Sequence, residues 1–135
     1  MKRKIQVIEG IGDHFAAKLN KAGISSIGVL LNNGATKAGR TRIAKETGID
    51  EGKILTWVNM ADLFRIKGVG EEYSQLLEAA GVDTVKELKN RVPANLHAKM
   101  VEVNEKKKLV RQVPYPKSVE KWVEHAKKLE PKVSY

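Results

Sequence analysis

The stretch that decides the fold occurs twice, as Ile8-Glu9-Gly10-Ile11-Gly12-Asp13 and as Ile66-Lys67-Gly68-Val69-Gly70-Glu71. Residues 8–30 and 66–88, hereafter the first copy and the second copy, align without a gap at an offset of 58, and seven of the 23 aligned positions are identical. Self-similarity at a fixed offset indicates that one supersecondary unit is present twice. A single physical explanation must therefore serve both copies.

Each copy has the pattern of a tight turn followed by a helix. Two glycines around one apolar residue give the backbone the freedom that a tight turn requires. Behind the turn, apolar residues recur at i, i+4 and i+7, the spacing of one helix face. They are Phe15, Leu19 and Ala22 in the first copy, and Tyr73, Leu77 and Ala80 in the second. Gly23 and Gly81 then stand where a helix ends in the left-handed conformation.

A further helical stripe, Ile54, Trp57, Val58 and Ala61, precedes the second turn, so the predicted unit is helix, tight turn, helix. This unit resembles the helix-hairpin-helix motif of DNA repair, recombination and polymerase proteins. In that family the amides beside the glycines and the next helix's N-terminus hold a backbone phosphate, whatever the base sequence. The resemblance implies an all-α fold of two tandem helix-hairpin-helix repeats, a SAM-domain-like helical bundle.

Nearly the whole chain is also similar to an uncharacterised family of tandem helix-hairpin-helix proteins, known as a domain of unknown function. The matching stretches include Thr47-Gly48-Ile49, Trp57-Val58, Gly68-Val69-Gly70, Ala80-Gly81-Val82 and Trp122-Val123. This second resemblance supports the fold and implies no established activity.

Stops and caps predict where the helices lie. In the first half of the chain, helices are expected over 13–22, from Ser25 or Ser26 to Leu31, and, after a turn at 32–34, over a stretch that ends at Thr47. The later helices are expected over 51–65, 71–80, 84–90 and 94–103, and from Ser118 to about Leu129. Residues 105–117 are expected to form a charged linker. We therefore predict a first repeat over residues 1–60 and a second over 61–135, the latter including this linker and the C-terminal helix. Trp122 matches Trp57 at an offset of 65.

Composition favours a polyanionic partner. The chain has 25 Lys and Arg against 16 Asp and Glu, a net charge of +9. It has no cysteine, which excludes disulfides and thiolate metal sites and fits a reducing cytoplasm. No apolar run approaches the roughly 20 residues of a membrane span, so no membrane partner is expected.

The expected nucleic-acid contacts are the turn glycines and the cations near them. Free amides and the positive end of a helix together form an anion site. A second set of cations lies on the helix that ends at Thr47 and could follow a phosphate backbone. The predicted contact residues are Gly10, Gly12, Lys18, Lys37, Arg40, Arg42, Arg65, Lys67, Gly68 and Gly70. The partner is then the backbone of DNA or RNA, with DNA favoured by the resemblance.

An alternative explanation is a protein–protein adaptor whose turns are purely structural. Asp13, Glu71 and Glu72 follow the turns, where their charge complements the helix dipole and would repel a phosphate. A solvated surface is likewise the usual role of a charge run.

No catalytic constellation emerges from the sequence. His14, His97 and His125 lack metal-ligand spacing, and no cofactor is expected. Residues 34–41 come within one residue of a phosphate-loop pattern, but Arg40 replaces its lysine and the context is helical. Trp57 and Trp122 lie in apolar stripes and are expected in the core. We therefore expect a binding protein rather than an enzyme.

Overall fold

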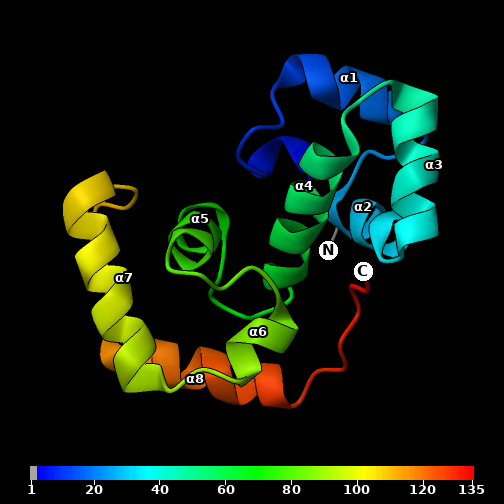
Figure 1. Cartoon of the computed structure of the whole chain (residues 1–135). Coiled ribbons are helices and arrows are strands. Elements are labelled where there is room, and N and C mark those ends of the chain that lie inside the picture. Colours follow the sequence, from blue (N-terminus) through cyan, green and yellow to red (C-terminus); the bar gives the residue numbers. More distant parts are fainter. Residues whose placement is uncertain (1–2) are drawn as a thin grey trace. The chain divides into compact units, whose positions relative to one another are not determined.

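The computed structural model describes residues 3–135, and the elements of regular secondary structure in that range are helices (Figure 1). The elements are the 3-10 helix η1 (Ile5–Val7) and the α-helices α1 (Asp13–Lys21), α2 (Ile27–Gly34), α3 (Lys37–Thr47), α4 (Glu51–Leu63), α5 (Glu71–Ala79), α6 (Val85–Lys89), α7 (Pro93–Lys107) and α8 (Pro116–Lys127). Within the described range, strand pairing is limited to an isolated bridge between Lys4 and Ser26. The all-α prediction is confirmed.

The chain divides into two compact units. Unit 1 comprises the described residues up to Asp62 together with Lys132–Tyr135, and unit 2 comprises Leu63–Pro131. The sequence-based boundary lay after residue 60 and assigned the last four residues to the second repeat. In unit 1, α3 packs against α1 and α2; in unit 2, α7 packs against α5 and α8, and α8 packs against α6.

The backbone around the two turns has the same conformation in both copies. Gly10 and Gly68 have φ angles of +93° and +94°, values that L side chains rarely adopt. Amide-to-carbonyl hydrogen bonds recur 58 positions apart. These bonds are Ile11 to Ile8 and Val69 to Ile66 in the turns, and Ile24 to Leu19 and Val82 to Leu77 at the helix ends. The predicted left-handed glycines after α1 and α5 are confirmed, because both have positive φ.

A tryptophan packs against each turn from the last long helix of the same unit. A Cβ atom at Gly10 would lie 3.2 Å from Trp57 Nε1, and one at Gly68 would lie 3.0 Å from Trp122 Nε1. Each tryptophan is 4% exposed, which confirms the core assignment. The helix that covers each turn thus follows that turn in the chain.

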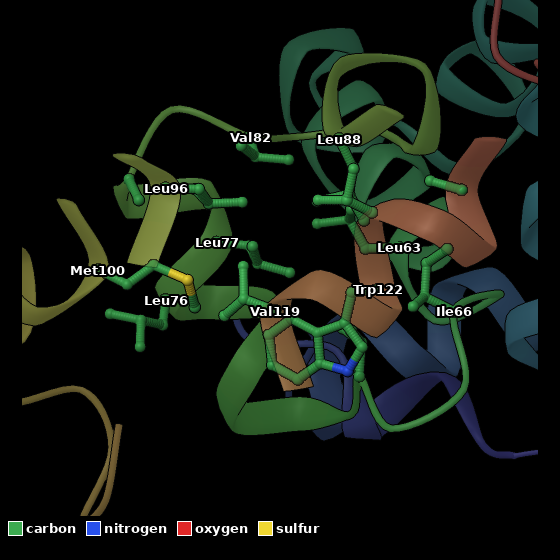
Figure 2. Packing of buried hydrophobic residues seen from close by; sticks show 14 of the residues in the cluster. Leu63, Ile66, Leu76, Leu77, Val82, Leu88, Leu96, Met100, Val119 and Trp122 are labelled. Carbon is green, nitrogen blue, oxygen red and sulfur yellow. The ribbon is translucent and has the colours of Figure 1, made fainter. Parts of the chain in front are cut away.

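Aromatic side chains complete both contacts. The ring centroids of Phe15 and Trp57 are 5.2 Å apart, and those of Tyr73 and Trp122 are 5.3 Å apart. In unit 2, Trp122 belongs to a core contributed by α5, α6, α7 and α8 (Figure 2). Leu76 and Leu77 from α5 and Met100 from α7 are fully buried in it.

Some predicted helix boundaries were wrong. The expected turn at 32–34 is helical, since α2 continues to Gly34 and the connection to α3 is Ala35–Thr36. Helix α7 runs to Lys107, and α8 begins at Pro116, so the linker of residues 105–117 is reduced to 108–115. Proline suits the first helical position because its missing amide is not needed there. Tyr115 therefore takes the N-cap position that was expected of Ser118.

The remaining connection between α7 and α8 is held by one side chain. Asn104 donates to the Val110 carbonyl at 3.1 Å and accepts from the Val110 amide at 3.0 Å. These two bonds fix the backbone where the sequence suggested a charged linker.

We predict that the turn is more sensitive to a Cβ atom than other left-handed positions of the same unit. Gly23 has φ of +83° with open space around its Cβ position, so Gly23→Ala should cost only the left-handed strain of about 1 kcal/mol. Gly10→Ala adds a contact with buried Trp57 and should cost at least about 1 kcal/mol more. Urea unfolding of the two variants measures the difference, and equal losses would contradict the proposed packing constraint.

Candidate functional site

An open pocket of about 480 Å³ lies beside the second turn. Its walls come from the turn and from one face of α8: Lys67, Gly68, Ser118, Lys121, Trp122 and His125. A neighbouring hollow of about 420 Å³ continues along α8 and is lined by Glu120, Lys121, Glu124, His125 and Lys128. The pocket therefore combines an apolar floor with basic side chains.

Local structure explains why these side chains meet. Trp122 is fixed against Gly68, so the α8 residues one turn before and one turn after it are held beside the glycine turn. His125 lies there, and its Nδ1 atom accepts a hydrogen bond of 3.2 Å from the Lys67 amide. An acceptor Nδ1 requires that the ring proton be on Nε2.

Backbone donors are available at the same turn. Within the described chain, the amides of Gly68 and Gly70 donate no hydrogen bond. Gly70 is also the N-cap of α5 and provides no side-chain cap, so the first amides of that helix receive no side-chain acceptor from it. Glu71 and Glu72, exposed in the first turn of α5, supply negative charge close to these amides.

The corresponding positions of unit 1 have a different chemistry. At the offset of 58, Lys67 corresponds to Glu9; at the offset of 65, Lys121 and His125 correspond to Thr56 and Met60. The two turns thus share a backbone and differ in charge. The basic pocket is therefore a feature of unit 2.

The predicted contact residues are divided between the two units. Lys67, Gly68 and the adjoining Gly70 gather at the second turn. Arg65 precedes them and donates to the Glu130 carbonyl at 2.8 Å. The remaining predicted contacts belong to unit 1: Gly10, Gly12, Lys18, Lys37, Arg40 and Arg42. There, Lys37 and Arg42 are exposed on α3 and Lys18 is half-buried on α1.

Arg40 is a correction. It was predicted as an exposed contact, but only 3% of it is exposed. Its guanidinium donates to the carbonyls of Gly34 at 2.8 Å, Ala35 at 3.1 Å and Ser134 at 2.7 Å. It also lies 5.9 Å from the Tyr135 ring centroid. Arg40 therefore holds the end of α2 to the C-terminal residues and is almost completely buried.

Sequence reasoning missed three residues of the pocket: Ser118, Lys121 and His125. They fall at positions −4, −1 and +3 relative to Trp122, and only the packing of Trp122 on the turn brings them to the site. A signal for them was present in the sequence, because the offset of 65 aligns the helix of Trp57 with the helix of Trp122. Comparing all residues of these two helices, and not only the apolar ones, would have drawn attention to Lys121 and His125.

One carboxyl with a raised pKa lies at the end of α5 that is opposite to the turn. Desolvation raises the pKa of the Glu78 carboxyl, the charge of Asp83 adds to this rise, and Lys107 opposes it. Glu78 lies near the C-terminal end of α5, whereas the turn precedes its N-terminal end. Among the described residues, no three His, Asp or Glu side chains are grouped as metal ligands.

None of the described helices is both long enough and apolar enough to cross a membrane. This result concerns residues 3–135 of the chain.

Comparison with models of protein families shows which family the chain belongs to. The family model described as a domain of unknown function, DUF4332, matches residues 9–129. The chain belongs to the DUF4332 family. Comparisons of this DUF4332 protein with curated proteins and with solved structures find no match.

We predict that Arg40 contributes to stability, in contrast to its exposed neighbour Arg42. Arg40→Met removes three buried or half-buried hydrogen bonds to carbonyls and should lower the free energy of unfolding by about 2–4 kcal/mol. Arg42 donates to Asn33 Oδ1 at the surface, so Arg42→Met should cost less than about 0.5 kcal/mol. Urea titrations followed by circular dichroism provide both values. Similar losses in both variants would show that burial of Arg40 matters little.

Proposed function

We propose that this DUF4332 protein binds nucleic-acid backbones without reading base sequence and without catalysis. DNA is the favoured partner, and a reducing cytoplasm is the proposed location. Each turn with its flanking helices then forms one of two tandem helix-hairpin-helix repeats. The observation that carries the proposal is the pocket at the second turn, where Lys67, Lys121 and His125 adjoin the turn glycine Gly68.

The chemistry of the pocket suits a phosphodiester. Lysine side chains supply positive charge without base specificity, and the glycines permit close approach of a ligand to the backbone. The amides of Gly68 and Gly70 donate no hydrogen bond within the described chain, so they can donate to phosphate oxygens. Binding should therefore weaken steeply as the salt concentration rises, as expected when counterions are released from a backbone.

A protein–protein adaptor is the second candidate, and one observation favours it. Glu71 and Glu72 are exposed in the first turn of α5, where they would repel a phosphate. An adaptor normally presents a contiguous apolar patch. Within the described range, the large apolar side chains that are exposed are Val92, Tyr115 and Tyr135, from three separate segments.

We predict opposite effects from two changes at the second turn. Lys67→Glu should weaken binding to all sequences alike, by roughly tenfold, and lower the salt slope by about one. The double change Glu71→Gln/Glu72→Gln should strengthen binding, because it removes negative charge next to the amides. Fluorescence anisotropy with single- and double-stranded oligonucleotides over a salt series measures both effects.

Lys106→Glu is the matched control, because Lys106 is an exposed lysine of the same unit that lies on α7 and outside both pockets. It makes the same change in net charge and should affect binding much less than Lys67→Glu. If neither change at the second turn alters affinity, the turn is structural and the adaptor explanation is favoured.

A further inference from the structure

The hydrogen bond between Lys67 and His125 depends on a proton. His125 Nδ1 accepts the Lys67 amide at 3.2 Å, which only a neutral imidazole can do. A protonated imidazole carries N–H groups on both nitrogens, so protonation would place two donors opposite each other. The bond must then break and the Lys67 amide is released.

We propose that His125 makes the second-turn phosphate site proton-dependent, an inference that rests on the proposed function. In the neutral form, His125 occupies an amide of the turn. In the protonated form it frees that amide for a phosphate oxygen and adds a positive charge beside Lys67 and Lys121. Both changes favour a bound phosphodiester, so affinity rises as pH falls across the range of about 5–8 in which histidines change charge.

The charges around His125 define how this coupling works. The turn contributes Lys67, and α8 contributes two cations, Lys121 and Lys128, and two carboxylates, Glu120 and Glu124, which line the same hollow as His125. Two more cations reach the C-terminal part of the unit: Arg65 bonds to the Glu130 carbonyl and Lys89, from α6, bonds to the Leu129 carbonyl.

In the proposed coupling, the negative charge of a bound phosphate attracts the protonated, positively charged form of His125. Ligand binding and proton uptake therefore favour each other by the same factor, as linkage requires. Unit 1 has Met60 at the position that corresponds to His125 and Glu9 in place of Lys67. The proposed coupling is thus specific to unit 2.

The test measures binding at constant salt between pH 5.5 and 8.5, using an oligonucleotide with a pH-insensitive label. Phosphodiesters keep their charge over this range, so the pH dependence comes from the protein. The natural protein should bind roughly tenfold more tightly at pH 5.5 than at pH 8.5, as expected for one gained contact. His125→Met introduces the residue that unit 1 has at the corresponding position, Met60. It should reduce the difference in affinity between the two pH values to less than about twofold.

Two further variants keep the result interpretable. His125→Gln retains a side-chain acceptor for the Lys67 amide and cannot titrate, so it should also be insensitive to pH. His14→Gln alters an exposed histidine of unit 1 and should retain the full pH dependence. A pH dependence that is unchanged in both His125 variants overturns the proposal.

Nuclear magnetic resonance of the free protein separates the two possible failures. The Lys67 amide signal should shift with the same midpoint as the His125 ring protons, without any nucleic acid. A Lys67 amide that does not follow His125 overturns the proton-dependent bond. Salt-dependent binding with no pH effect overturns only this inference, whereas no binding at any pH overturns the proposed function and this inference together.

Discussion

Each unit depends on a tryptophan indole that packs against the first glycine of a tight turn. A Cβ atom at Gly10 or Gly68 would lie 3.2 Å or 3.0 Å from that indole, so a side chain at either position would require the buried ring to shift. The contact also fixes which residues of that helix lie beside the turn. In unit 2 it brings His125, three positions after Trp122, to the amide of Lys67. Packing thus determines the geometry of the site, and the neighbouring side chains determine its chemistry.

Local rules were enough to predict most of the fold. Glycine pairs, the i, i+4, i+7 stripes and the left-handed glycines are signals carried by a few adjacent residues, and they gave the helices around both turns. The errors lie where one local signal outweighed another. Asn32-Asn33-Gly34 has the composition of a turn, yet the side chain of Asn33 bonds back to the Val29 carbonyl at 2.8 Å within α2.

The site was harder to predict because its residues are distant in sequence. Lys67 and His125 are 58 positions apart, and no spacing rule connects a turn with a helix that follows it so much later. Arg40 shows the converse difficulty. A basic residue among other basic residues resembles part of a charged surface, but its environment is set by carbonyls of α2 and of the C-terminal residues. Counting charges along a segment cannot distinguish these cases.

The charge beside the second turn is finely balanced. Lys67 and Lys121 bring two positive charges to the pocket, while Glu71 and Glu72 begin the helix that follows the turn. The two carboxylates complement the helix end when no ligand is present, which stabilises α5 and disfavours a phosphate by the same interaction. Under the proposed coupling, protonation of the His125 imidazole would add a third positive charge to the pocket. Its proton would remove an acceptor from the Lys67 amide and add a charge at the same point. Under this proposal, the positive charge of protonated His125 offsets part of the repulsion between a bound phosphate and the carboxylates of Glu71 and Glu72.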